Sequence, residues 1–245
     1  MFFLLLALVL QSPQSIALKR VEVLRVNPGD IERVPKSLRA IFVDPVPDAE
    51  AVDSLDEAAK RAGFTPRLPK SANKPQFGVI DTIRALATIG VADLADALRE
   101  AKVTNVAVPQ NWDRITIAIE QGRGILADYD DFLITQSPPL TLNTPSGFLL
   151  DQFVEVLARV VGMNAPAART LRQNFAANPA AFFPIPSRYE MDIHEVRLNS
   201  GLGVLLQNAG KVGELALAWT SADRTYFVTG LLTEAQAIEL ANSIQ

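Results

Sequence analysis

Apolar residues recur at every second position in short segments separated by turn residues, and this pattern constrains the chain more than any other feature. Ile115, Ile117 and Ile119, for example, are separated by single small or polar residues. Such alternation is typical of a strand with one buried face. Because short turns join neighbouring segments, we expect an antiparallel meander. The segments with strand patterns are 103–108, 115–120, 125–129, 132–136, 191–198, 203–207, 215–219 and 225–229, with turns at 111–114 and at Asp130 and Asp131.

Helical patterns interrupt and flank these strands. Segment 148–161 has apolar residues at helical spacing, and segment 165–177 has Pro166 in its first turn, where proline is tolerated. These two helices form an insertion, over residues 146–178, between strands of the sheet. Further helices are expected at 55–62, at 77–102 as two helices or one helix broken at Gly90, and at 233–244.

Two of these helices carry explicit end signals. Ser54, with Glu57 three positions later, forms the pattern of a capping box, and Gly63 is a C-terminal stop. At the C-terminus, the strand at 225–229 runs into a helix that Thr233 opens. The fold class is therefore α+β: a mostly antiparallel sheet with helices packed on one face, closed by a C-terminal strand followed by a helix.

Prolines and charged residues suggest the domain organisation. Residues 16–53 comprise a lead-in strand at 16–26, a turn at 27–30 and a linker rich in proline and acidic residues at 35–53. We expect one α+β extracytoplasmic domain over 54–245. Within it, prolines are expected to end the sheet or break the chain at Pro138, Pro139, Pro145, Pro184 and Pro186.

The N-terminus contains an uninterrupted apolar run from Phe2 to Leu10. This run is shorter than the roughly 20 residues of a membrane-spanning helix and resembles the apolar region of a signal peptide. We interpret residues 1–15 as a signal peptide or a truncated membrane anchor, with a buried N-terminal element as the alternative. Both favoured interpretations place the rest of the chain outside the cytoplasm, either membrane-anchored or secreted and periplasmic.

Composition excludes several classes of function. The chain of 245 residues has a net charge of −4 and 49% hydrophobic residues, which together indicate a folded protein without the basic surface of a nucleic-acid-binding protein. It has no cysteine and a single histidine, His194. Disulfide frameworks, thiolate metal sites and histidine-rich zinc sites are therefore excluded.

Two groups of residues have the types that catalysis or metal binding uses. Asp128, Asp130 and Asp131 offer oxygen ligands but lack the spacing of a calcium loop, so a hydrated hairpin turn is favoured over a metal site. His194 lies in an alternating segment without a serine or cysteine motif beside it, which favours a polar strand position over a catalytic role. We therefore assign no catalytic, cofactor-binding or metal-binding residue.

Glycine-containing and aromatic segments also have two interpretations each. Segments 122–124 and 201–203 do not precede helices, so we interpret them as hairpin turns rather than phosphate loops. The apolar segment 182–186 is interpreted as part of a core rather than as the lip of an exposed ligand site. Trp112 is assigned to the packing of a hairpin, with a surface anchor as the alternative.

Three segments carry a family resemblance. SLDEAAKRAGF at 54–64, followed by TPRLP at 65–69, resembles the opening of a bacterial domain of unknown function. That domain lies at the extracytoplasmic end of membrane-anchored anti-sigma factors and related lipoprotein-type proteins. The stretch WTSADRTYFVTGLLTEAQAIELANSIQ at 219–245 is similar to the end of the same domain, and QSPQSIALKRVEVLRV at 11–26 is similar to its juxtamembrane stretch.

The resemblance implies a non-enzymatic, exported or membrane-tethered domain that acts by sensing or interaction, with a protein partner outside the cytoplasm and membrane attachment through the N-terminus. The alternative is a periplasmic carrier or binder of an apolar ligand, which would use a groove between the helix pair and the sheet, with a volume of roughly 300 Å³ or more. A hydrolase, the third class, would need two carboxylates that converge in a cleft with shifted pKa values.

Overall fold

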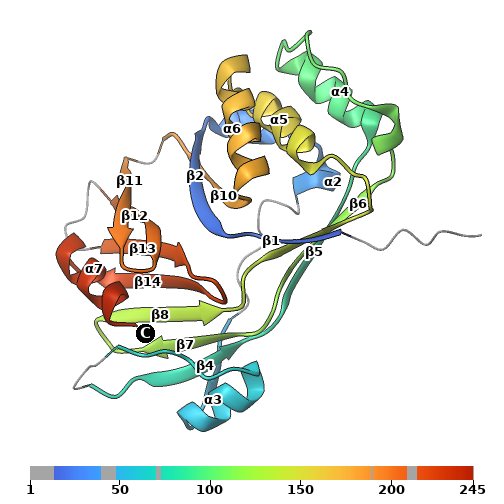
Figure 1. The fold of residues 1–245 in the computed structure, drawn as a ribbon. Coiled ribbons are helices and arrows are strands. Elements are labelled where there is room, and N and C mark those ends of the chain that lie inside the picture. The colour runs from blue at the N-terminus through green and yellow to red at the C-terminus, as the bar shows by residue number, and fades with distance from the viewer. Residues whose placement is uncertain (1–13, 40–47, 70–72, 189, 209–213, 245) are drawn as a thin grey trace, which may run out of the picture.

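The structure is a computed structural model that describes residues 14–39, 48–69, 73–188, 190–208 and 214–244 (Figure 1). Its helices and mostly antiparallel strands confirm the α+β class. The helices are α1 Pro28–Glu32, α2 Lys36–Arg39, α3 Leu55–Ala62, α4 Val91–Glu100, α5 Leu150–Val160, α6 Ala165–Ala177 and α7 Glu234–Ser243. The strands are β1 Gln14–Ala17, β2 Arg20–Val26, β3 Glu50–Val52, β4 Gln76–Ile80, β5 Ile83–Thr88, β6 Thr116–Gln121, β7 Gly124–Asp128, β8 Phe132–Ser137, β9 Thr141–Thr144, β10 Ala180–Pro186, β11 Met191–Leu198, β12 Gly201–Asn208, β13 Glu214–Thr220 and β14 Thr225–Leu231.

The described strands form three sheets. The large sheet has the order β11-β12-β13-β14-β8-β7-β4-β3, and its neighbours are all antiparallel. The small sheet, of order β1-β9-β6-β5, is also antiparallel. The third sheet has two strands, β10 and β2, which pair in parallel, and we call it the ribbon. Figure 1 shows the ribbon between the large sheet and helices α5 and α6.

Three segments of chain pass directly between the large and small sheets. β4 continues into β5 across residues 81–82, β6 into β7 across 122–123, and β8 into β9 across 138–140. These crossings lie side by side, because β4 pairs with β7, β5 with β6, and β6 with β9. We call this shared crossing the bend. Pro138 and Pro139 do end the large-sheet strand as predicted, but the chain then enters the small sheet as β9.

Side chains fix the geometry of the bend. Arg123 Nε donates a hydrogen bond to Asp81 Oδ1 at 2.9 Å, and Gln121 Nε2 donates to Ser137 Oγ at 2.7 Å. A Cβ atom at Gly122 would lie 3.0 Å from the Pro138 ring, so a larger residue would push the crossings apart. Segment 122–124 is therefore part of the bend, and its interpretation as a hairpin turn is wrong.

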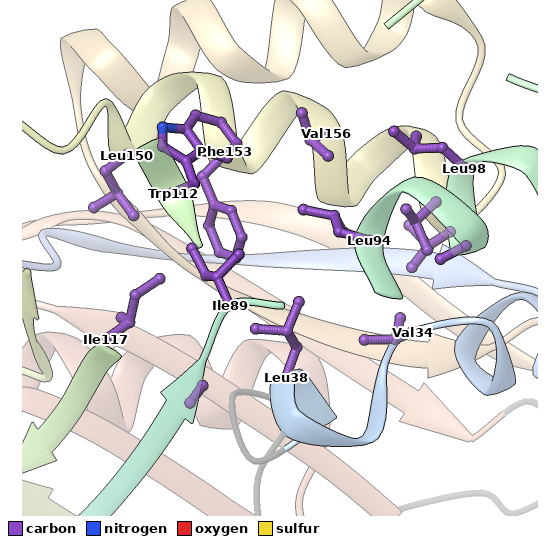
Figure 2. Close-up of a cluster of buried hydrophobic side chains, with 14 of the residues drawn as sticks. Val34, Leu38, Ile89, Leu94, Leu98, Trp112, Ile117, Leu150, Phe153 and Val156 are labelled. Carbon is purple, nitrogen blue, oxygen red and sulfur yellow. The ribbon is translucent and has the colours of Figure 1, made fainter. Parts of the chain in front are cut away.

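The first core lies between the small sheet and helices α2, α4 and α5 (Figure 2). Trp112 is 2% exposed, and its ring centroid lies 5.3 Å from that of Phe148 and 5.9 Å from that of Phe153. Such tilted and edge-on pairs contribute roughly 0.5–1.5 kcal/mol beyond the burial of their area. Trp112 thus packs in this core and not on the surface, but the hairpin to which it was assigned is not formed, because 103–108 is not a strand.

The described N-terminal residues pair and pack with later parts of the chain, and the strand expected at 16–26 forms as β1 and β2. β1 pairs with β9 and β2 pairs with β10, while Val34 and Leu38 are buried in the first core. Pro28 opens α1 where a turn was expected. Residues 40–47 of the expected linker lie outside the described residues.

The segment 77–102 is helical only in its last part. Residues 76–88 form β4 and β5, and α4 begins at Val91. The apolar spacing in this segment fits both periods, and pairing with β7 and β6 determines the outcome. The strand expected at 103–108 is absent from this described stretch, where Val103, Val106 and Val108 instead pack irregularly against the first core.

β10 shows how a strand can contain prolines. Pro184 and Pro186 were expected to break the chain, yet they pair with Leu24 and Val26 of β2. Among the described strands, β10 has a neighbour on one side only, so a missing N–H group need not cost a ladder hydrogen bond.

Helices α3 and α7 cover the same face of the large sheet, as the predicted fold class requires. This helix face carries the fully buried row Ile134, Val228, Leu217 and Leu205, which are neighbours in register. Ala237 and Ala241 of α7 pack against this row, and Ala58 of α3 packs on Val79 and Ile125. Ser54 caps α3 by accepting from the Glu57 N–H, but the predicted capping box is incomplete because the Glu57 side chain accepts from the Asp53 N–H. Thr233 and Gln236 form a complete, reciprocal box at the start of α7.

We predict that Ala237→Asp destabilises the protein by about 3–5 kcal/mol, because it buries an unpaired charge at a position that is 0% exposed. Ala235→Asp is the matched control, since Ala235 is exposed on the same helix. Urea denaturation of both variants measures the difference. Equal stability of the two variants would show that α7 does not dock on the sheet.

Candidate functional site

The opposite face of the large sheet, which we call the open face, carries a strip of apolar side chains. Alternation along the strands places Leu133, Thr229, Ala216 and Leu206 in one row across β8, β14, β13 and β12, one residue from the buried row of the helix face. The described helices α3 and α7 lie on the other face. Part of this row is therefore left to face solvent.

This row forms the floor of a groove with a volume of about 500 Å³. Small-molecule sites typically have volumes of about 300–1,000 Å³ and mostly apolar walls. Met191 and Leu231 add further apolar wall, and Leu231 is 68% exposed. The groove can therefore bury apolar surface of a ligand that the protein itself does not cover.

Three carboxylates line the groove: Asp130 and Asp131 stand at one side, and Glu214 on β13 also lines it. Asp130 and Asp131 occupy the turn between β7 and β8, as predicted, and both are exposed. Asp130 has φ of 69°, and its backbone N–H donates to Asp128 Oδ1 at 3.0 Å, which holds the turn in this conformation. The acidic side of the groove is therefore preorganised.

The same turn is attached to β14 by its backbone. Leu231 N–H donates to the Asp131 carbonyl at 3.0 Å. At Gly230, which has φ of 159°, a Cβ atom would lie 2.4 Å from that carbonyl oxygen. Only glycine permits this close approach without a shift of the backbone. The wall of the groove thus depends on backbone contacts that a sequence pattern does not reveal.

The ribbon covers a neighbouring part of the open face. β2 lies against β12 and β13, and Val204 and Ala218 on that face are buried. Thr220 Oγ1 donates to the Lys19 carbonyl, and the Arg25 guanidinium donates to the Met191 carbonyl at the groove's edge. The ribbon therefore limits the groove to one end of the sheet.

His194 lies on the helix face, outside the groove, where it connects edge strand β11 to α7. Its Nε2 atom is 3.3 Å from Glu234 Oε1, and its Nδ1 atom is 3.5 Å from Asp192 Oδ2. The hydrogen bond to Glu234 raises the pKa of His194 above its ordinary value, and Asp192 adds to the effect. The two ring nitrogens face different carboxylates, an arrangement suited to holding a helix end in place.

Other predicted residues lie apart from the groove. Gly201 closes the hairpin between β11 and β12, as expected. Phe182 packs against the first core, with its ring centroid 6.0 Å from that of Phe175, and so supports the core interpretation of its segment. The side chains of Phe183, Pro184 and Pro186 lie outside the described residues.

A hydrolase would need two carboxylates that lie close together, and Glu22 and Glu195 are one such pair. Burial raises the pKa of Glu22 on β2, nearby Arg20 lowers it, and Glu195 on β11 raises it further. Glu22 forms an ion pair with Arg20, which gives this partly buried carboxyl a structural partner. Among the described residues, no group of three histidine, cysteine, aspartate or glutamate side chains is placed to hold a metal ion.

The groove was not predicted at this place. A ligand groove was expected between the helix pair and the sheet, but α5 and α6 pack on each other through Ala158, Ala168 and Leu171. The sequence of β12 does indicate an apolar open face. Val204, Leu205 and Leu206 are consecutive apolar residues, a pattern typical of strands with two apolar faces.

Comparison of the chain with protein-family models, with curated proteins and with solved structures finds no match. Across the stretches that the structure describes, no helix is both long and apolar enough to cross a membrane. The apolar run from Phe2 to Leu10 lies outside the described residues.

We predict that His194 makes stability depend on pH. Because its pKa is raised in the folded state, its contribution is fully present below its unfolded pKa near 6.5 and is lost as pH rises through the folded value. Denaturation midpoints of wild type and His194→Gln should therefore differ at about pH 5.5 and converge at about pH 8.5. A difference between the two proteins that is the same at both pH values would contradict this contribution.

Proposed function

We propose that this chain is a non-enzymatic binding domain that acts by sensing or interaction, with the groove on the open face as its binding surface. The observation that carries the proposal is the apolar row Leu133, Thr229, Ala216 and Leu206, which continues a well-paired sheet yet is not covered by a described helix. Exposed apolar surface of this kind typically marks a binding site.

The chemistry of the groove favours binding over catalysis. Its floor consists of leucine and alanine side chains, which contribute burial and dispersion, and of Thr229, whose hydroxyl has no histidine beside it to activate it, because His194 lies on the opposite face of the sheet. The carboxylates Asp130 and Asp131 are exposed on a turn, whereas a catalytic acid or base is typically placed where burial or a neighbouring charge shifts its pKa.

Carriage of an apolar ligand is the second candidate. It is favoured by the volume of about 500 Å³, which exceeds the roughly 300 Å³ that such a ligand requires. A carrier must give up its ligand to an acceptor, whereas a sensor must change its contacts with a partner when the ligand binds. Both functions use the same groove and the same apolar floor.

The location outside the cytoplasm is part of the proposal. It rests on the apolar run from Phe2 to Leu10 and on the resemblance of 54–69 and 219–245 to extracytoplasmic domains of anti-sigma-factor-like proteins. When the full chain is expressed in a bacterium, residues beyond about 20 should be cleaved by protease added to spheroplasts. Recovery of a protected cytosolic protein would contradict this location.

Binding in the groove is tested with a pair of substitutions on one strand and one face. Leu206 lines the groove, whereas Leu202 lies four positions away on β12, is 55% exposed and does not line it. Leu206→Asn should weaken binding of the neutral apolar dye Nile red by about tenfold, because each buried methyl or methylene group contributes roughly 0.8 kcal/mol.

Leu202→Asn should bind the dye as wild type does, and thermal melting should show that both variants are folded. The same dye affinity in the two variants would show that the groove is not the binding surface.

A further inference from the structure

We propose that the groove binds a single alkyl chain whose polar end carries positive charge. This inference rests on the proposed function and adds the chemical class of the ligand. Three properties of the groove support it: the linear shape of its floor, the mostly apolar side chains on that floor, and the negative charge of its lining carboxylates.

The floor is a narrow strip and not a rounded cavity. Leu133, Thr229, Ala216 and Leu206 occupy one position each on four neighbouring strands. Because neighbouring strands are about 4.8 Å apart, this row is about 14 Å long, and Leu231, Glu214 and Asn208 lie beside it along the same face. A strip of this form matches a single extended alkyl chain better than a ring system or a helix, whose diameter is about 10 Å.

The floor also discriminates between an alkyl chain and an extended peptide. The backbone groups of β8, β14, β13 and β12 are directed to each other within the sheet, and Thr229 has the only polar side chain in the row. A peptide lying across these strands would leave its own amide groups without partners, at a cost of about 1–3 kcal/mol for each buried group. An alkyl chain has no such groups.

Charge at the side of the groove selects the polar end. Asp130 and Asp131 carry negative charge on a turn that is held by Asp128 and by the Leu231 amide. Because the turn is preorganised, a cationic head group gains attraction without having to order the carboxylates first. An anionic head group at the same place would be repelled, and both effects would weaken with added salt.

The test compares three probes with the same alkyl chain and different heads, each below its critical micelle concentration: dodecyltrimethylammonium, dodecyl maltoside and dodecyl sulfate. Isothermal titration calorimetry of the full-length protein measures their affinities. We expect the cationic probe to bind most tightly and the anionic probe least. The expected margin between the cationic and neutral probes is about threefold to tenfold, as for exposed charge pairs.

The double variant Asp130→Asn/Asp131→Asn should reduce that margin, with Glu214 left as the remaining lining carboxylate, and should leave the affinity for dodecyl maltoside unchanged. Asp53→Asn/Asp56→Asn, which removes two exposed carboxylates at the start of α3, is the matched control and should keep the margin. Equal affinity for the three heads, or the same margin in both double variants, would overturn the assigned head group.

These outcomes are separate from a failure of the proposed function. If none of the probes binds, or if Leu206→Asn leaves all three affinities unchanged, the groove itself is not a binding site. If all three bind through Leu206 without regard to charge, the groove binds apolar chains and only the cationic class is wrong.

Discussion

The bend between the large and small sheets is the constraint on which the rest of the structure depends. Three neighbouring crossings change direction together, with Arg123 bonded to Asp81 and Gln121 to Ser137, while Gly122 allows Pro138 to approach. Because the same chain segments serve both sheets, the first core and the core beneath α7 are joined through continuous strands. The bend therefore places the helix-rich half beside one end of the large sheet, and no described helix covers the other end of its open face.

Successive residues of each strand in the large sheet point to opposite faces, and the two faces have different roles. Ile134, Val228, Leu217 and Leu205 are completely buried beneath the helix side, whereas their immediate neighbours form the groove floor. In strands of this kind, the requirement for an apolar core determines one face, and the other is free to carry function. An apolar row on that second face contributes little to the core that α7 covers, so binding is the physical explanation for it that we favour.

The sequence predicts local features of this fold well and its long-range pairings poorly. The capped helices after Ser54 and Thr233 and the helix pair at 148–177 are correct because their signals lie within a few neighbouring residues. The strands at 76–88 and the parallel ribbon are determined by partners that lie far away in the chain, so spacing alone could not identify them. The groove depends in addition on how β14 approaches the turn at Asp131, a contact that only the folded backbone reveals.

Methyl NMR of the methionine side chains tests the central claim most directly, because the chain has three methionines and one of them, Met191, lines the groove. Met163 lies near α6, away from the groove, and provides an internal reference. Titration of 13C-methyl-labelled protein with dodecyltrimethylammonium should shift the Met191 signal progressively to saturation and leave the Met163 signal in place. A saturating shift of Met163 with Met191 unchanged would contradict the assignment of the binding surface to the open face of the large sheet.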